Sequence, residues 1–312
     1  MQTIFVSRAP IFSLSPAWVI LTRRVSRVRS LLGSVPPPSL VLLSSFIIQV
    51  SNVLAKSLFD SLGAVGTTFL CKALAALLLL AIARPQWRGH ARQDYLLLGL
   101  MGLSMAGMGL AYYSAIDRIP LGIASTLEFI GPLGVSVIGS RRLLDLIWVS
   151  LAAAGIVLLN PIGYTSLDSV GVALALLSGL CWASYIVTSG AIARSLPGGS
   201  GLTLAMLVAA LLLFLPGAAT AGTALLNPIV LLIGLVAACF GTVLPYSLEF
   251  EAVRRMSPRV FGVLISIEPA IAALVGFLFL HETLSLRTLM ATVLVTAAAI
   301  GVTLFGRSPT PL

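Results

Sequence analysis

The chain consists of long apolar runs interrupted only by short polar breaks, and this pattern restricts the fold more than any other feature. From residue 39 onward, each run approaches the ~20 apolar residues that a helix needs to cross a membrane. Apolar residues make up 58% of the chain and charged residues 9%, against about 25% charged in soluble domains. A soluble protein of this composition would expose large apolar patches. Cytosolic globular, disordered and fibrous classes are therefore excluded.

We predict an all-α polytopic membrane protein with ten transmembrane helices. Because the breaks between the runs are short, neighbouring helices are expected to form antiparallel hairpins. The predicted spans are residues 39–59, 63–83, 94–116, 120–140, 146–163, 170–192, 201–220, 229–250, 260–280 and 286–305.

Basic residues are distributed unevenly between the two sides of the predicted membrane. With the N-terminus in the cytoplasm, fifteen of the nineteen Lys and Arg residues fall in cytoplasmic segments and three in outer loops, while Lys72 lies within a span. Basic loops are typical of the cytoplasmic side, so both termini are predicted to be cytoplasmic. We attribute the net charge of +9 to this topology, and we expect no nucleic-acid partner.

Residues 1–38 differ from the rest of the chain, with five arginines and three consecutive prolines. Most of this charge follows the apolar stretch 11–21, whereas a cleaved signal carries its charge first. We therefore predict a basic cytoplasmic tail that can include an interfacial segment, with a start codon assigned too far upstream as the alternative.

The sequence lacks the usual motifs of metal-binding and nucleotide-binding sites. Cys71, Cys181 and Cys239 lie in apolar runs without CxxC spacing, and neither His90 nor His281 has a second His or Cys nearby. We expect no metal site and no cofactor. The absence of a GxxxxGK[ST] pattern argues against ATP-driven transport by this chain alone.

The two halves of the sequence echo each other. Residues 55–58 (Ala-Lys-Ser-Leu) correspond to 193–196 (Ala-Arg-Ser-Leu), and glutamates at 128 and 268 are each followed closely by proline. Five helices in each half is an odd number, which places the halves in opposite orientations. Such inverted repeats are typical of secondary transporters with a substrate site near the membrane midplane. The predicted domains are a tail (1–38), a first repeat (39–165), a second repeat (166–306) and a C-terminal tail (307–312).

Several motifs resemble those of the drug/metabolite transporter superfamily with EamA-type repeats. The resemblance covers about residues 40–305, and within the superfamily it is greatest to the bacterial threonine/homoserine exporters. At His281 the family more usually has glycine. The motifs are Leu-Ala-Lys-Ser-Leu-Phe (54–59), Pro-Leu-Gly-Ile-Ala (120–124) with Leu-Glu-Phe (127–129) and Gly-Pro-Leu (131–133), Ser-Arg-Arg (140–142), Leu-Pro-Tyr-Ser-Leu-Glu (244–249), Glu-Pro-Ala (268–270) and Phe-Leu-His-Glu-Thr-Leu (279–284).

The resemblance implies a secondary active transporter of the bacterial inner membrane that exports small amino acids by alternating access. Protons are the expected coupling ion. A carrier of another small metabolite or drug is the nearest alternative, although a phosphorylated cargo would need more intramembrane cations than Lys72 and an aromatic cargo more than 7% aromatic residues. An intramembrane enzyme and a channel are weaker alternatives, because they need clustered catalytic groups or a polar ring.

Three ionisable residues lie deep within predicted spans, where a charge costs about 2.5–3.5 kcal/mol or more. Glu128 is interpreted as a proton-coupling or ammonium-binding carboxylate, with a structural pair to Lys72 as the alternative. Glu268 either takes part in transport or satisfies backbone groups freed at Pro269. Glu249 is given a lower weight because it lies near the end of its span, within reach of basic residues.

The remaining candidates are helix-breaking prolines and polar side chains. Prolines in mid-span kink or interrupt helices, so breaks in the pathway are predicted where they occur. Polar residues spaced by three or four along the first span favour one face of that helix; they are Ser44, Ser45, Gln49 and Asn52. The predicted breaks are at Pro132, Pro269 and Pro245, and the predicted pathway residues are Gln49, Asn52, Tyr112, Tyr185 and Tyr246.

Overall fold

A computed structural model describes residues 35–83, 85, 89, 91–138, 147–148, 150–152, 154–155, 158, 167–195, 200–253 and 264–305. Within these ranges every regular element is a helix, and six helices are long and apolar enough to cross a membrane. The prediction of an all-helical polytopic membrane protein is confirmed. Most of the predicted fifth span, nearly all of the N-terminal tail and the C-terminal tail lie outside the described residues.

The first half contains five described helices. The earliest begins two residues inside the predicted tail, because proline is well suited to the first turn of a helix. The third span is continuous, whereas the fourth is divided in two. The helices are α2 (Pro37–Lys56), α3 (Phe59–Ala83), α4 (Arg92–Ile116), α5 (Leu121–Glu128) and α6 (Ile130–Ile138).

The second half also has an interrupted span in the corresponding place, the ninth, and its eighth span contains a π-helical turn where the third span is continuous. Its last helix has the bounds predicted from the sequence, and the others begin or end within about three residues of the predicted limits, apart from the interrupted ninth span. The elements are α8 (Ser169–Ser195), α9 (Ser200–Ala221), a 3₁₀ turn (Gly222–Leu226), α10 (Pro228–Ala238), a π-helical turn (Cys239–Val243), α11 (Leu244–Val253), α13 (Glu268–Leu280) and α14 (Leu286–Phe305).

Local chemistry sets several helix ends. Asn227 accepts a hydrogen bond from the Ile229 N–H (2.9 Å) and so caps α10. Gly63 has φ +66°, a conformation that suits glycine, and it separates the first turn of α3 from its long apolar body. The predicted second span accordingly starts at this residue.

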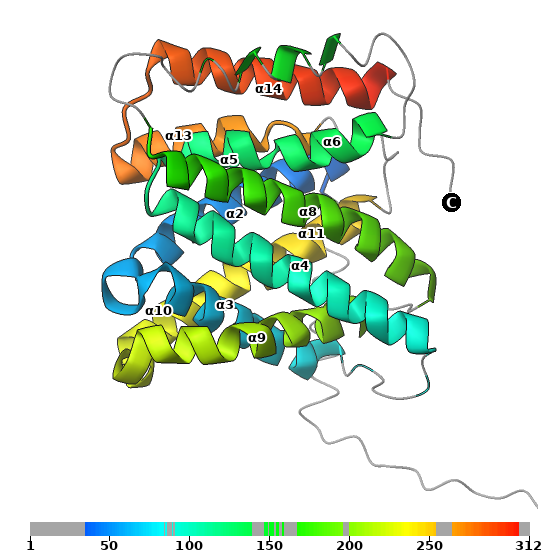
Figure 1. The fold of residues 1–312 in the computed structure, drawn as a ribbon, viewed down its shortest axis with the longest axis vertical. Helices are drawn as coiled ribbons and strands as arrows, with labels where there is room; N and C mark the ends of the chain where they lie inside the picture. The colour runs from blue at the N-terminus through cyan, green and yellow to red at the C-terminus, as the bar shows by residue number, and fades with distance from the viewer. Residues whose placement is uncertain are drawn as a thin grey trace, which may run out of the picture.

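The helices run side by side across Figure 1, and the packing pairs join the two halves of the chain. Helix α4 packs on α8, α2 packs on α11, α3 on α9, and α5 on α13. Exchanging each helix of the first half for its counterpart in the second leaves this set of pairs unchanged. The arrangement supports the proposed two-repeat organisation.

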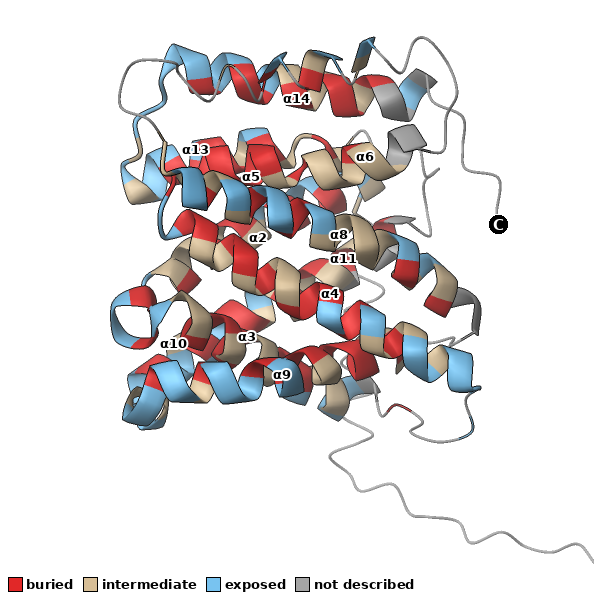
Figure 2. Ribbon diagram, in the orientation of Figure 1, coloured by how far each residue is buried: buried red, intermediate tan, exposed pale blue. Residues whose placement is uncertain are grey.

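The outside of the molecule is strongly apolar, and the interior holds polar as well as apolar side chains. Many large apolar side chains are exposed, among them Leu215 at 75% and Leu180 at 67%. The exposed parts of the helices are pale blue in Figure 2. Polar side chains such as Ser44, Gln49 and Ser178 are instead buried. Apolar side chains gain little from leaving lipid, so the interior of a membrane protein can hold the polar groups.

Candidate functional site

Both predicted prolines in the fourth and ninth spans accompany helix breaks, but the breaks lie before them. The fourth span is interrupted at Phe129 and the ninth at Ser266–Ile267. Proline lacks the N–H that would bond four residues back and its ring crowds that carbonyl, so the disruption falls on the N-terminal side. Pro245 likewise follows a helix irregularity, the π-helical turn Cys239–Val243. This turn contains Gly241, the residue four positions before the proline, whose carbonyl the proline cannot bond.

Glu128 is the last residue of α5 and lies against α8 from the second half. Its carboxylate accepts a hydrogen bond of 2.5 Å from the Ser178 hydroxyl, and that hydroxyl also contacts the Met108 carbonyl at 3.0 Å. The backbone of α8 reaches the break because Gly179 has no side chain: a Cβ there would lie 2.5 Å from the Glu128 carbonyl oxygen. A glycine pair, Gly131 and Gly179, thus allows the broken helix to touch α8.

Glu268 is the first residue of α13 and is held by the first span. The Gln49 amide nitrogen donates to its carboxylate at 3.1 Å, and the Asn52 amide nitrogen donates to the Gln49 oxygen, also at 3.1 Å. Gln49 and Asn52 are 1% and 9% exposed. This chain of donors fixes the amide of Gln49 with its nitrogen toward Glu268, so three predicted residues form one hydrogen-bonded unit.

Lys72 lies on α3 next to α4, where Gly109 leaves room for its side chain. A Cβ at Gly109 would lie 2.9 Å from the Lys72 Cε. Lys72 and Glu128 interact electrostatically, yet the ion pairs found within the described part of the chain do not include Lys72. The structural pair considered for these two residues is therefore not a direct contact, and the hydrogen-bond partner of Glu128 is Ser178.

Glu249 was predicted to be a weaker candidate than Glu128 and Glu268 because it lies near the end of its span. It nevertheless lies between helices, as they do. The Ser44 hydroxyl donates to its carboxylate at 3.1 Å, and Tyr185 and Tyr246 interact with each other and with Glu249. Its basic neighbours in sequence, residues 254 and 255, lie outside the described residues.

The structure also places one further predicted residue, Tyr112, and shows two carboxylate partners that were not predicted, Ser178 and Ser44. Tyr112 is buried and shares a hydrogen bond of 2.6 Å with the Ser125 hydroxyl rather than contacting a carboxylate. Ser178 was missed, and its signal in the sequence is only that of one small hydroxyl within an apolar run. The sequence pattern on the first span did include Ser44, but nothing in it indicated a glutamate as the partner.

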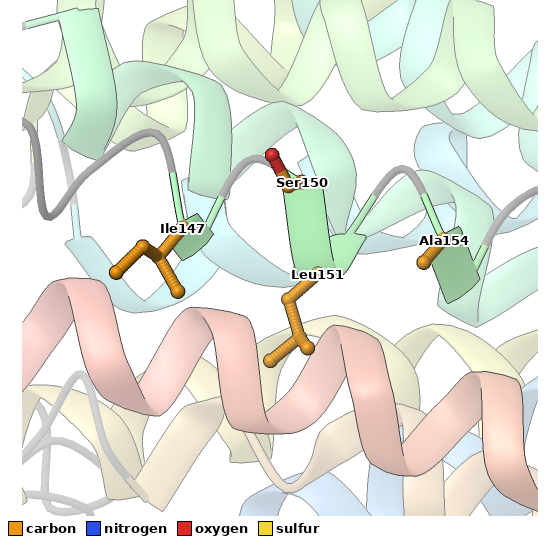
Figure 3. Close-up of a pocket in the computed structure, with 4 residues that line it drawn as sticks. All are labelled: Ile147, Ser150, Leu151 and Ala154. Atoms are coloured by element: carbon orange, nitrogen blue, oxygen red, sulfur yellow. The ribbon is translucent and has the colours of Figure 1, made fainter.

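One surface hollow lies away from these groups. It has a volume of about 400 Å³ and is lined by Ile147, Ser150, Leu151 and Ala154, beside α14 (Figure 3). Its lining is almost wholly apolar and contains no ionisable side chain. We therefore locate the candidate site at the half-buried carboxylates and not at this hollow.

Outside the spans, one exposed ion pair joins the two halves. Arg118 bonds Asp168 at 3.1 Å, and Asp168 also accepts hydrogen bonds from the backbone N–H groups of Val170 and Gly171 at the start of α8. The Gly171 N–H and the Arg118 guanidinium lower the pKa of Asp168. Both side chains are partly exposed, so the pair contributes little to stability.

The arrangement suits a small zwitterion better than a reaction. Three half-buried carboxylates and one lysine line the helix interfaces, which offers attraction for an ammonium and a carboxylate group. In the described residues there is no group of three or more His, Cys, Asp or Glu side chains placed to hold a metal ion.

Comparison with known proteins places this geometry in context. Residues 169–304 match the EamA-like transporter family. The threonine/homoserine exporter RhtA of Salmonella typhimurium (strain LT2) is 44% identical over 270 residues, which cover 86% of this chain and 91% of that protein. The exporter RhtA of Escherichia coli (strain K12) is 43% identical over the same coverage.

The fold also matches a solved structure. A protein crystal structure superposes with a TM-score of 0.60 and 19% sequence identity, over 86% of this chain and 98% of its own. At this level of identity the likeness concerns the fold alone.

Proposed function

We propose, from the premise that this chain belongs to the EamA-like transporter family, that it exports threonine, homoserine and similar small amino acids. The observation that carries the proposal is the identity of 43–44% to the named exporters over 86% of the chain. Members of this family are transporters, so the chain is a membrane transporter and not an enzyme.

Glu128 is the proposed partner of the substrate ammonium group, and Lys72 the proposed partner of the substrate carboxylate. Among the described residues, the carboxylate of Glu128 accepts a hydrogen bond from Ser178, which a charged ammonium group can replace with a hydrogen bond that is also an ion pair. Lys72 interacts with Glu128 without pairing directly. A zwitterion between them would satisfy both charges.

The two glutamates are not equivalent in this proposal. Glu268 lies in the first turn of α13, where the backbone N–H groups favour a negative charge, and it is also held by Gln49. Glu128 ends α5, where the carbonyl groups of the helix repel a negative charge. Glu128 therefore gains more from a bound cation, whether an ammonium group or a proton.

Alternating access with proton coupling is the proposed mechanism. The helix pairs that join the two halves, α4 with α8 and α2 with α11, are counterparts under exchange of the halves, as expected for two repeats that rock against each other. Protonation of Glu128 would release the ammonium group of the substrate. The proposed location is the bacterial inner membrane with both termini in the cytoplasm, in accord with the distribution of basic residues.

Counterflow in proteoliposomes tests the proposal. Purified protein is reconstituted with unlabelled threonine or homoserine inside, and uptake of the labelled amino acid is followed with and without an imposed pH gradient. We expect saturable uptake that responds to the gradient. Glu128→Gln should lose the response, whereas Asp117→Asn, a carboxylate-to-amide change at an exposed turn, should keep it.

The outcomes separate the parts of the proposal. Full gradient-dependent transport by Glu128→Gln would contradict the coupling role while leaving the substrate class intact. No uptake of any amino acid by folded protein would contradict the substrate class and favour another small metabolite as cargo. Uptake that does not saturate would favour a channel.

A further inference from the structure

A glutamate of the second half binds the start of a helix in the first half. Both carboxylate oxygens of Glu282 accept the Leu121 N–H, at 2.9 and 3.0 Å. Leu121 is the first residue of α5 and follows Pro120 directly. The contact lies at the end of the molecule where the turn after α4 meets the end of α13, on the left of Figure 1. We call it the 282–121 contact.

The local structure of α13 is shaped to present this carboxylate. His281 adopts the left-handed conformation (φ 54°, ψ 31°), which turns the chain sharply at the end of the helix. The Glu282 N–H then bonds back to the Gly276 carbonyl at 3.2 Å. A Cβ at Gly276 would displace the Glu282 carboxylate from this position, because it would collide with a carboxylate oxygen.

Helix α5 connects this contact to the candidate site. Its eight residues begin with Leu121 and end with Glu128, so the contact and the central carboxylate are about 10 Å apart along one rigid rod. The break at Phe129 follows at once and separates this rod from α6. A tilt of α5 at its Leu121 end therefore moves Glu128.

The neighbouring packing shows what must separate when this end opens. Helices α5 and α13 pack closely below the 282–121 contact, and a Cβ at Gly122 would lie 2.6 Å from the Ala273 Cα. Glu282 crosses this interface at its edge. While the carboxylate holds the Leu121 N–H, it ties the end of α13 to the start of α5.

We propose that the 282–121 contact is a latch that holds the α4–α5 end of the transporter closed, and that Glu282 is a positioning residue acting on Glu128 through α5. The latch ties α13 of one half to α5 of the other. It breaks when the halves separate at this end. The effect of the latch on transport rests on the proposed function. The existence of the latch does not, because the opening of this end is measured without substrate.

Accessibility of a buried cysteine tests the latch. In a background in which Cys71, Cys181 and Cys239 are replaced by alanine, Ser125→Cys places one thiol a single turn inside α5, where the native side chain is 4% exposed. The rate of labelling by a membrane-impermeant thiol reagent reports opening. Glu282→Ala should raise this rate about tenfold or more, as expected for loss of a charge-assisted hydrogen bond made only in the closed state.

Two further variants keep the test sharp. Glu282→Gln retains an acceptor oxygen without the charge, so its labelling rate should lie between the parent and Glu282→Ala, and it serves if the alanine variant does not fold. Arg118→Ala removes the exposed ion pair that joins the halves at the same end and should leave the rate within about twofold of the parent.

Each outcome decides the proposal. Unchanged labelling in folded Glu282→Ala or Glu282→Gln would overturn the latch, as would an equal increase in Arg118→Ala. If labelling rises but counterflow of amino acids is absent even in the parent, the latch stands and the proposed substrate class fails.

Discussion

The fourth and ninth spans occupy corresponding positions in the two halves, yet their glutamates differ in helix position and in hydrogen-bond donor. Glu128 closes a helix and is held by one hydroxyl from α8. Glu268 opens a helix and is held by an amide that is itself fixed by a second amide. Each carboxylate thus accepts one side-chain hydrogen bond from another span, from a hydroxyl for Glu128 and from an amide for Glu268. In the proposed mechanism, the difference assigns cargo binding to Glu128, at the end of its helix, and not to Glu268, at the start of its helix.

The largest expected effect is on the stability of the protein, at the contact between Gly131 and Gly179 next to Glu128. Gly131→Ala should destabilise the protein by at least about 3 kcal/mol, because the new Cβ meets the Gly179 backbone, which cannot rotate away. Unfolding in mixed micelles measures the change. Gly134→Ala, in the same helix with open space at its Cβ, should be neutral or stabilising by up to about 1 kcal/mol. Equal effects would show that the contact does not constrain α6.

Transport by the two glutamine variants sharpens the comparison of the carboxylates. Glu128→Gln should reduce gradient-driven uptake about 100-fold, and Glu268→Gln about 10-fold, because only the former removes the proposed ammonium partner. Initial rates of labelled threonine counterflow against concentration give both values. The reverse order would assign the ammonium group to Glu268.

The far end of α13 offers a smaller test. His281→Gly should raise stability by about 1 kcal/mol, since the left-handed conformation costs a residue with a Cβ more than it costs glycine. His281→Ala keeps the Cβ and should give no such gain. Thermal midpoints of the two variants in detergent compare them directly, and a gain shared by both would point to the loss of the imidazole instead.

The smallest expected effect concerns the exposed pair between the halves. The pKa of Asp168 is lowered in the folded state, so its contribution to stability is present above the unfolded pKa of about 3.9 and is lost as the pH falls through the lower folded value. Asp168→Asn should therefore lower the thermal midpoint slightly at pH 7 and have no effect in strongly acidic buffer. A difference that persists in acid would mean that the amide also fails as a helix cap.

Much of the framework was predictable from the sequence. The apolar runs gave the helices because a span must satisfy all its backbone groups internally, and α14 has the predicted bounds. Gln49 and Asn52, which their spacing placed on one face of the first span, are hydrogen-bonded to each other. The prolines indicated that the fourth and ninth spans break, although the breaks fall two or three residues earlier.

The partners of the charged residues were not predictable. Ser178 is 50 residues from Glu128, Gln49 is 219 from Glu268, and Glu282 is 161 from Leu121. A local pattern indicates that a residue is buried, but it carries no information about which distant helix lies opposite. Glu249 was underrated for the same reason, since its partner Ser44 is on another helix.

The sequence by itself determined that the chain lies in a lipid bilayer, where its helices run and that each charge within a span is costly. Hydropathy and proline chemistry act within a few residues, so a local pattern is enough. Only the tertiary structure decided which hydroxyl or amide meets each carboxylate, and that Glu282 reaches the start of α5. Those pairings depend on how closely helices approach, which glycines at 131, 179 and 276 permit at single points. Contact between distant segments is a property of packing, and packing is settled by the whole chain at once.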